Sequence, residues 1–437
     1  MNVTGIIAEY NPFHTGHAYH IKEAKAQTGA DFIVVAMSGD FVQRGGPALF
    51  DKYTRARMAL LGGADLVLEL PAAFSCSFAE DFAACGTALL DGLGVVNCLC
   101  FGSEHGHTED FMDGAAFLLQ ESSEYSLLLQ EELKRGSTFP AARQTALKKV
   151  CAKHGPASLV SLISSPNNIL GLEYCKAILR QNAALRPFTI LRKGDGYHDV
   201  ISHGEFASAT GIRAALLNEF PYGLPDGCEV ASFSALTFLP DSVRDVFCLS
   251  KPLWPEDFSS LLNEKILDMA QKEDRGTAGF SQISDISPDM ALRLSRLSLD
   301  ITGWEGRIRQ LKTRQYTYTR INRGLTRLLL NITEEQTFCW KKQGYTPYAR
   351  VLGFKKQAAP LFSAIKKSSR IPLITKPAAA FSVLSGPSLD EFQKDLYASH
   401  LYQSAFCQRY PSAGFDALDA EYAVFKNEFN RKLLVLE

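Results

Sequence analysis

The sequence lacks the features that define exported, membrane-spanning and P-loop proteins. It has no uninterrupted apolar run approaching 18 residues and no basic leader before an apolar core, so it predicts neither a transmembrane helix nor a signal peptide. Its ten cysteines lack paired spacing apart from Cys98 and Cys100, which favours reduced thiols over a disulfide framework. No Gly-x4-Gly-Lys-Ser/Thr loop occurs, so that mode of phosphate binding is excluded. We therefore expect a cytoplasmic protein with no membrane partner.

The composition indicates a globular protein of more than one domain. The chain has 437 residues, of which 46% are hydrophobic and 21% charged, so wholesale disorder is excluded. At roughly 100–200 residues per domain, this length corresponds to two or three domains, each large enough to bury a core. No internal repeat or low-complexity tract is visible in the chain.

The charges are distributed unevenly along the chain. The formal net charge is −1, yet residues 303–376 hold sixteen Lys and Arg against three Glu, which gives this segment +13 and leaves −14 on the remainder. The near-neutral total by itself argues against a generic nucleic-acid-binding protein, DNA-binding proteins included, whereas a basic block of this kind favours a polyanionic partner. The alternative interpretation is a solvated helical face whose cations bind no partner.

The first hundred residues alternate short apolar runs with helical patterns, which predicts an α/β fold. Near-continuous apolar strands separated by helices are typical of a parallel sheet covered on both faces. Such sheets bind ligands outside the carboxyl ends of their strands. The expected strands are 3–9, 31–37, 64–70 and 95–101, and the expected helices are 18–27, 53–61 and 78–90.

Polar residues follow the ends of these strands, where a ligand site is expected. Residues 9–17 follow the first strand, residues 38–47 the second and residues 102–104 the fourth. Because the carboxyl ends of parallel strands meet at one edge of a sheet, the sequence predicts that its polar chemistry lies on one rim.

Beyond residue 100 the pattern continues and then changes. Residues 109–153 have a helical pattern, and another strand is expected at 188–191. After about residue 240 helices dominate, and a mixed, basic section follows from about residue 340. We therefore expect two domains, residues 1–240 with the parallel sheet and residues 241–437 with a mainly helical, basic composition.

The sequence His14-Thr15-Gly16-His17, between the first strand and the first helix, favours phosphate binding. Gly16 lets the backbone approach a ligand, and the free amides and dipole of the helix start attract an anion. His14 and His17 are placed to donate to phosphoryl oxygens, and fixed donors of this kind are the main catalytic device in phosphoryl chemistry. A zinc site completed by His20 is the competing interpretation. Since no further ligand is evident close in sequence, we expect no metal ligands here and expect His20 to pack beneath the helix.

With these motifs in place, the sequence resembles a known enzyme family. The histidine pair resembles the HxGH motif of nucleotidyltransferases, relatives of class I aminoacyl-tRNA synthetases, and residues 208–213 resemble their second phosphate motif. The wider combination resembles the bacterial tRNA(Met) cytidine acetate ligases over most of the chain. The segments that carry this resemblance are 9–17, 38–45, 63–71, 101–104, 166–171, 194–199, 350–354 and 371–376.

The resemblance implies a Rossmann-like nucleotidyltransferase sheet in residues 1–240 and a tRNA-binding segment at 303–376. It implies that ATP and acetate form acetyl-adenylate and pyrophosphate, and that the acetyl group then passes to the wobble cytidine of elongator tRNA(Met), giving N4-acetylcytidine. Mg²⁺ is expected with ATP. Acetate is already ionised at neutral pH and attacks phosphorus without a general base, and a wobble base is single-stranded, the form in which RNA bases enter pockets.

The resemblance also implies roles for particular residues. His14 and His17 are expected to be catalytic at the ATP phosphates, while Gly102 admits the nucleotide against the fourth strand. Arg213, Asp40, Gln43 and Arg44 are expected phosphate or substrate contacts, with bracing of the loop as the alternative for the last three. The expected ATP-binding residues are Ile7, Ala8, Glu9, Tyr10, Asn11, Pro12, Phe13, His14, Thr15, Gly16, His17, Ala18, Tyr19, His20, Gly102, Asn168, Leu191 and Arg192.

Two other functions stay open from the sequence. A small-molecule adenylyltransferase would keep the histidine pair but would leave the +13 segment without a role. A non-catalytic RNA-binding protein on a nucleotidyltransferase fold would tolerate the loss of His14 and His17, which neither enzyme would.

Overall fold

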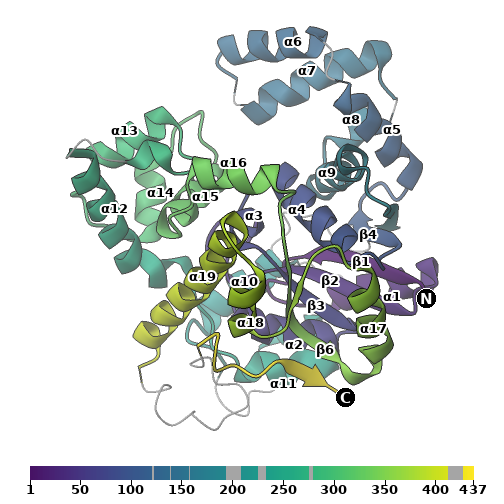
Figure 1. Ribbon diagram of the computed structural model, residues 1–437. Coiled ribbons are helices and arrows are strands. Elements are labelled where there is room, and N and C mark those ends of the chain that lie inside the picture. The colour runs from purple at the N-terminus through teal and green to yellow at the C-terminus, as the bar shows by residue number, and fades with distance from the viewer. Residues whose placement is uncertain are drawn as a thin grey trace.

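A central sheet with helices on both faces dominates the computed structural model, which describes residues 1–120, 123–137, 139–156, 158–192, 208–224, 233–274, 279–411 and 427–437. Figure 1 shows one helical group above the sheet and a second group beside it. Within the described residues, eight strands form one sheet in the order β5-β4-β1-β2-β3-β6-β7, with β8 paired to β6.

The five strands of the first half run parallel, which confirms the predicted α/β fold. The strand β1 lies between β4 and β2, with Val3 opposite Phe32 and Thr4 opposite Cys98. The strand β3 is buried along its whole length because helices cover both faces of the sheet. The strands are β1 (Val3–Ala8), β2 (Phe32–Ser38), β3 (Leu66–Leu70), β4 (Cys98–Ser103) and β5 (Arg186–Leu191).

Alternate residues of each strand enter separate cores on the two faces of the sheet. In β2, Val34 belongs to the core that includes Phe82, whereas Ile33 and Val35 belong to the core that includes Met58. This division follows from the two-residue period of strand side chains. The helices of these layers are α1 (Thr15–Thr28), α2 (Lys52–Leu61), α3 (Ala72–Ser75), α4 (Ala79–Gly92), α9 (Pro166–Gln181), α10 (Ala209–Glu219) and α11 (Asp241–Leu249).

The second half contributes strands as well as helices. The strand β6 (Ala349–Lys355) pairs antiparallel with β3, and β7 (Leu373–Ile374) and β8 (Leu434–Leu436) pair parallel with β6. The sequence predicts only a mixed section after about residue 340, so it does not predict these three strands. The sheet therefore contains strands from both sides of residue 240, and the two-domain division stays a prediction.

The remaining helices include the two helical groups seen in Figure 1. The group above the sheet contains α5 (Thr108–Leu119), α6 (Ser123–Lys134), α7 (Phe139–His154) and α8 (Leu159–Leu162). The other helices are α12 (Ser259–Asp274), α13 (Pro288–Arg296), α14 (Trp304–Leu311), α15 (Tyr318–Leu329), α16 (Glu334–Lys342), α17 (Ala359–Ser368), α18 (Pro377–Val383) and α19 (Pro387–Arg409). Short 3-10 helices lie at Ser234–Phe238, Pro255–Phe258, Phe280–Gln282 and Lys356–Ala358.

Among the described residues, none of the helices combines the length and apolarity needed to cross a bilayer.

Candidate active site

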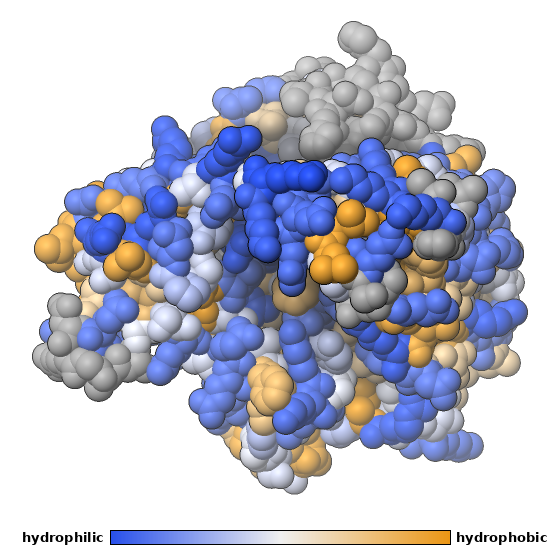
Figure 2. Space-filling view, turned by 90° about the horizontal axis from the view of Figure 1, so that it is seen from above, coloured by the Kyte–Doolittle hydropathy of each residue, from blue (hydrophilic) through white to orange (hydrophobic). Residues whose placement is uncertain are grey.

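A cavity of about 480 Å³ lies at the carboxyl ends of the parallel strands. Its walls come from the ends of β1, β4 and β5, from the starts of α1 and α10, and from α4 and α9. This is the rim at which the sequence predicted the polar residues to converge. Figure 2 shows a largely hydrophilic surface that is hollowed near its middle.

The loop between β1 and α1 is held in place by contacts from distant segments. The Asn11 side chain accepts a hydrogen bond from the Leu49 amide (2.7 Å), and the Asn11 carbonyl accepts one from Arg213 Nη1 (2.5 Å). The Glu9 carboxylate accepts a hydrogen bond from the Gln43 amide (2.9 Å). The second phosphate motif at α10 and the β2 loop therefore both meet the first histidine loop.

Arg55 forms hydrogen bonds that connect the ends of β1 and β2 beneath this loop. It is fully buried on α2 and donates from Nη1 to the carbonyls of Glu9 (2.6 Å) and Ser38 (3.1 Å) and from Nη2 to that of Gly39. A guanidinium presents several donors in a fixed plane, so one side chain sets the spacing between the ends of β1 and β2.

His14 and His17 form a reciprocal cap at the start of α1. His14 Nδ1 accepts a hydrogen bond from the Gly16 amide (3.1 Å), and His17 Nδ1 accepts one from the His14 amide (3.3 Å). The two rings lie 3.8 Å apart between centroids. Because each Nδ1 is an acceptor, the proton of each neutral ring is on Nε2. Both side chains line the cavity, so each brings an N–H donor to it.

The surroundings keep these rings neutral. Burial, with Arg192 and Arg213 nearby, lowers the pKa of His14 to about 3. Burial and the neighbouring His14 and Arg192 hold the pKa of His17 well below its ordinary value. A region that combines neutral N–H donors with arginines favours a polyanion such as a phosphate chain.

The ends of β4 and β5 form the opposite side of the cavity. A Cβ on Gly102 would come within 3.3 Å of the Arg192 side chain, so glycine keeps this wall open. Asn168 is buried on α9 and accepts a hydrogen bond from the Glu104 amide (2.9 Å), which fixes the end of β4 from behind.

The structure brings most of the predicted residues to the cavity and places others behind it. Pro12, Phe13, Thr15, Ala18 and Asn168 do not line it. The predicted residues that do line it are Ile7, Ala8, Glu9, Tyr10, Asn11, His14, Gly16, His17, Tyr19, His20, Gly102, Leu191 and Arg192, together with Gln43, Arg44 and Arg213.

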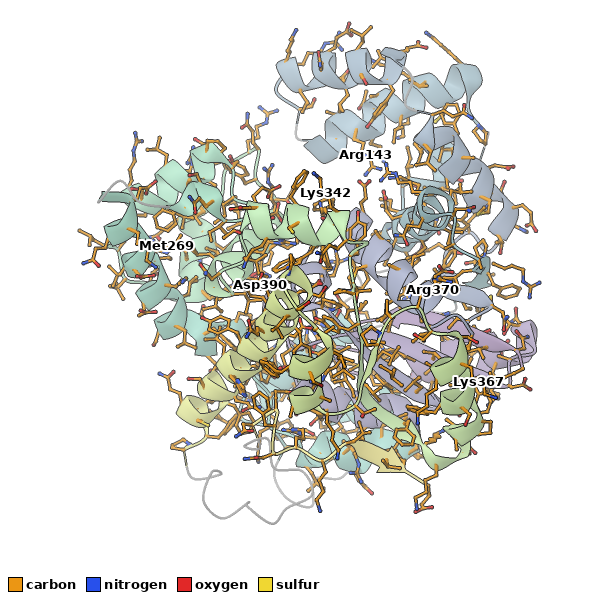
Figure 3. The ribbon with its side chains drawn as sticks, viewed as in Figure 1. Arg143, Met269, Lys342, Lys367, Arg370 and Asp390 are labelled. Atoms are coloured by element: carbon orange, nitrogen blue, oxygen red, sulfur yellow. The ribbon has the colours of Figure 1, made fainter. Side chains whose placement is uncertain are left out.

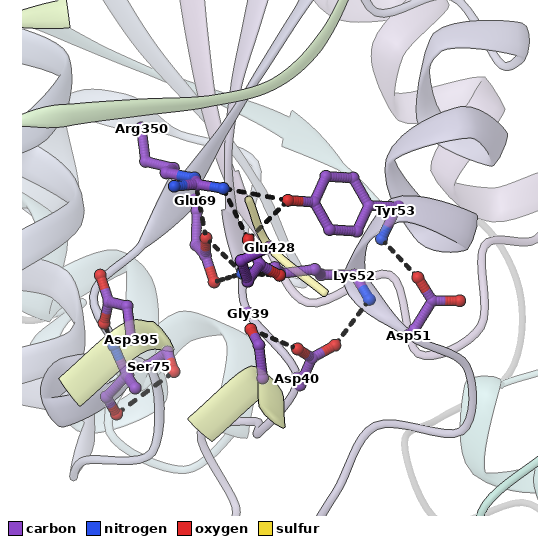
Figure 4. Close-up of polar contacts among 12 residues, drawn as sticks. Gly39, Asp40, Asp51, Lys52, Tyr53, Glu69, Ser75, Arg350, Asp395 and Glu428 are labelled. Carbon is purple, nitrogen blue, oxygen red and sulfur yellow. Dashed lines mark hydrogen bonds and ion pairs between the residues drawn. The ribbon is translucent and has the colours of Figure 1, made fainter. Parts of the chain in front are cut away.

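Asp40 lies outside the cavity, in a buried polar network. Its carboxylate accepts hydrogen bonds from the Lys52 amide (2.7 Å) and the Ser399 hydroxyl (2.9 Å). Burial raises the pKa of Asp40 to about 7, although Lys52 opposes this shift. Figure 4 shows Asp40 beside the buried ion pairs of Lys52, in the bracing position that the sequence left as the alternative.

His20 lies beside the thiol of Cys100. Its Nε2 is 3.6 Å from Cys100 Sγ, and burial, together with Arg192, lowers its pKa to about 4. In the part of the chain that the structure describes, no group of three or more His, Cys, Asp or Glu side chains is arranged to hold a metal ion.

The cations of residues 303–376 are spread over several environments. Arg307, Arg327 and Arg350 are buried, and Arg327 donates to the carbonyls of Ala73 (2.6 Å) and Cys76 (3.3 Å). Other cations of this segment pair with acids elsewhere in the chain, such as Lys341 with Asp81 (2.7 Å). Much of this charge therefore stabilises the fold.

The exposed cations of the same segment lie on different elements. Lys342 is exposed on α16 (Figure 3). Lys367 is exposed near the end of α17, and Arg370 is exposed just after this helix, where it pairs with Asp91 (Figure 3).

Sequence reasoning missed an aromatic wall of the cavity. Phe82 of α4, Phe101 of β4 and Tyr174 of α9 line it and are otherwise buried. In the sequence these residues stand at ordinary apolar positions, so they carry no signal that separates them from the core. The predicted motif at 194–199 lies outside the described residues.

Comparison with known proteins identifies the family. Residues 1–414 match the family HIGH Nucleotidyl Transferase. The chain is 37% identical over 411 residues to a tRNA(Met) cytidine acetate ligase of Thermoanaerobacter sp. (strain X514), covering 93% of this chain and 96% of the relative. It is 35% identical over 413 residues to the protein of that name from Acetivibrio thermocellus, covering 94% of this chain and 96% of the relative.

Solved structures give the same result. The crystal structure of Thermotoga maritima TmcAL in its apo form I matches with a TM-score of 0.86 at 28% identity, over 100% of both chains. A form II structure of the same protein, bound with alpha-thio ATP, matches with a TM-score of 0.83 at 27% identity, again over 100% of both chains. The chain is a ligase and belongs to the tRNA(Met) cytidine acetate ligase family of HIGH nucleotidyl transferases.

Proposed function

We propose that this protein uses ATP to activate acetate and then acetylates the wobble cytidine of elongator tRNA(Met). In the first step an acetate oxygen bonds to the α-phosphorus of ATP and pyrophosphate leaves, giving acetyl-adenylate. In the second step the exocyclic amine of cytidine attacks the acetyl carbon and AMP leaves, giving N4-acetylcytidine. A cytoplasmic location follows from this substrate.

The observation that carries the proposal is the reciprocal cap of His14 and His17. Each Nδ1 accepts a backbone N–H, so each Nε2–H is available at the cavity. Two fixed neutral donors stabilise negative charge that develops on a transferring phosphorus, and they need no reorganisation at the moment of reaction. The relatives named for cytidine acetate ligation and the alpha-thio ATP complex of the Thermotoga protein support the same substrate classes.

The cavity also suits ATP that carries its own metal ion. Among the described residues that line it, Glu9 is the only carboxylate. Mg²⁺ keeps several waters and binds substrate phosphates readily, so it does not need a full protein cage. We propose that Mg²⁺ is held mainly by the ATP phosphates and water.

Acetate-dependent pyrophosphate–ATP exchange tests the first step. RNase-treated protein is expected to exchange label only when acetate is present. His17→Ala should lower the exchange rate by about 10²–10³-fold, since it removes one charge-stabilising donor. His107→Ala is the matched control, because His107 is exposed and does not line the cavity.

The same assay discriminates between the alternatives. A small-molecule adenylyltransferase would exchange only when its own phosphate or mononucleotide acceptor is supplied, with or without acetate, and a non-catalytic RNA-binding protein would not exchange at all. If exchange remains absent after unmodified elongator tRNA(Met) is added, the proposed activation of acetate is wrong.

A further inference from the structure

We propose that Glu9 is a catalytic residue of the second step, and that it accepts the proton of the cytidine amine during acetyl transfer. This inference rests on the proposed function and identifies the side of the same cavity at which the cytidine would be bound. It follows from the strand order, the fixed orientation of the Glu9 carboxylate and the aromatic residues beside it.

The strand order separates the two sides of the cavity. Because β1 lies between β4 and β2, Gly102 and Leu191 mark one side, and Glu9 and Gln43 mark the other. If adenosine occupies the side of β4 and β5, with its phosphates at His14 and His17 on α1, the remaining side lies next to Glu9. The acetyl group on the α-phosphate would therefore be approached from the Glu9 side.

The carboxylate of Glu9 is fixed rather than free. Its Oε1 accepts the Gln43 amide (2.9 Å), and Gln43 Nε2 in turn donates to the Ser77 carbonyl (3.1 Å). The backbone carbonyl of Glu9 is held by the buried Arg55 (2.6 Å). Glu9 is partly exposed and lines the cavity, so its carboxylate is oriented and still reachable by a substrate.

Aromatic side chains of α4 and α9 also line the cavity, where Tyr174 contacts Phe101 of β4 (5.7 Å between ring centroids). Phe82 and Tyr174 are 2% and 3% exposed and still line the space. Tyr174 lies near enough to Glu9 for the carboxylate to contribute, after burial, to a raised pKa of its hydroxyl. RNA bases splayed from a loop stack on aromatic rings, and a Glu carboxylate is a natural acceptor for the N4 amine of cytosine.

The proposed step balances in atoms and electrons. The N4 lone pair forms a C–N bond to the acetyl carbon, and the N4 proton passes to the Glu9 carboxylate. The C–O bond to the phosphate then breaks, and its electron pair leaves with AMP. Glu9 returns the proton to solvent after the acetylated tRNA departs.

Glu9→Gln tests the proposal while preserving the local structure. The amide oxygen of Gln still accepts the Gln43 N–H, so the loop should stay folded. Because activation needs no base, acetate-dependent pyrophosphate exchange should fall far less than acetyl transfer, although Glu9 also lines the cavity proposed for ATP. Acetyl transfer to unmodified elongator tRNA(Met), followed with radiolabelled acetate, should fall by about 10²–10³-fold, as expected for the loss of a general base.

The outcomes separate this inference from the proposed function. If the native protein shows no acetate-dependent exchange, the proposed function fails. If the native protein exchanges and Glu9→Gln transfers normally, or loses exchange and transfer in parallel, the role assigned to Glu9 is wrong. Should Glu9→Gln not fold, Glu9→Asp keeps the charge but shortens the side chain, and transfer should again fall more than exchange. Glu23→Gln, on α1 and outside the lining of the cavity, is the carboxylate control.

Discussion

At the scale of single residues, the protonation of His14 and His17 decides what the cavity can bind. A protonated pair would repel itself across the 3.8 Å between the ring centroids. Burial and the nearby arginines prevent this by lowering both pKa values, and the backbone amides on Nδ1 select the Nε2–H tautomer. The site therefore obtains its positive charge from Arg192 and Arg213 and its directional donors from the histidines.

This arrangement predicts a spectroscopic result. In the free protein, ¹⁵N chemical shifts of His14 and His17 should report neutral rings with the proton on Nε2 from about pH 8 down to about pH 5, where an ordinary histidine titrates. A midpoint near 6.5 for either site histidine would contradict the neutral-donor interpretation.

At the scale of elements, α2 connects the strand ends to the buried centre of the molecule. Lys52 in its first turn contacts Glu69 (2.7 and 2.8 Å), and Arg55 one turn later contacts the ends of β1 and β2. The polar face of this helix is thus turned inward. An interpretation of the sequence in which charged residues face solvent would instead turn this polar face of α2 outward.

Removing Arg55 should therefore disturb stability and the site together. Arg55→Ala leaves the carbonyls of Glu9, Ser38 and Gly39 without their donor, and each buried group left unpaired costs about 1–3 kcal/mol. We expect a loss of about 3 kcal/mol or more in the free energy of unfolding, measured by urea denaturation, and a raised KM for ATP in the exchange assay. Arg186→Ala, at the exposed start of β5, should change neither quantity. An unchanged KM in a folded Arg55→Ala protein would contradict its positioning role.

At the scale of the whole molecule, residues 427–437 add the strand β8 to the sheet and contribute Glu428 to a buried charge network (Figure 4). Glu428 lies just before β8 and contacts Lys52 (3.3 Å), Arg350 (2.6 Å) and Tyr53 (2.7 Å). Burial alone would raise the pKa of Glu428, but Lys52 and Arg350 lower it to about 2. The network joins α2, β6 and the C-terminal segment, which are far apart in sequence.

Glu428→Ala should destabilise the protein by about 3–5 kcal/mol, because it leaves two buried cations without one of their partners. The pKa of Glu428 is lower in the folded state, so its contribution is present above the ordinary value of 4.5 and is lost as the pH falls towards 2. Urea denaturation across this range should show a weaker acid dependence in the variant. Glu437→Ala on the same segment removes an exposed pair with Lys356 and should cost no more than about 1 kcal/mol. Equal effects of the two substitutions would contradict the role of the buried network.

The sequence by itself determined the features that depend on local order. The alternation of apolar strands with helices predicted β1 to β4 and the first helices, because period and helix signals are read over short windows. The histidine pair was predicted at the carboxyl end of β1 for the same reason, since a strand, a loop and a capped helix start follow one another within a few residues. The family resemblance, now confirmed, rested on these motifs.

Only the tertiary structure decided which distant residues meet. Asp40 lies away from the rim, where its carboxylate accepts a hydrogen bond from Ser399 of α19. Arg307, Arg327 and Arg350 are buried, although the segment that contains them looked in the sequence like a single basic surface. Phe82 and Tyr174 line the cavity from helices that the sequence marks as ordinary core. The strand β6 belongs to the sheet because it pairs antiparallel with β3, which lies nearly 300 residues earlier in the chain. Such contacts depend on the packing of the whole chain, which no short window of sequence encodes.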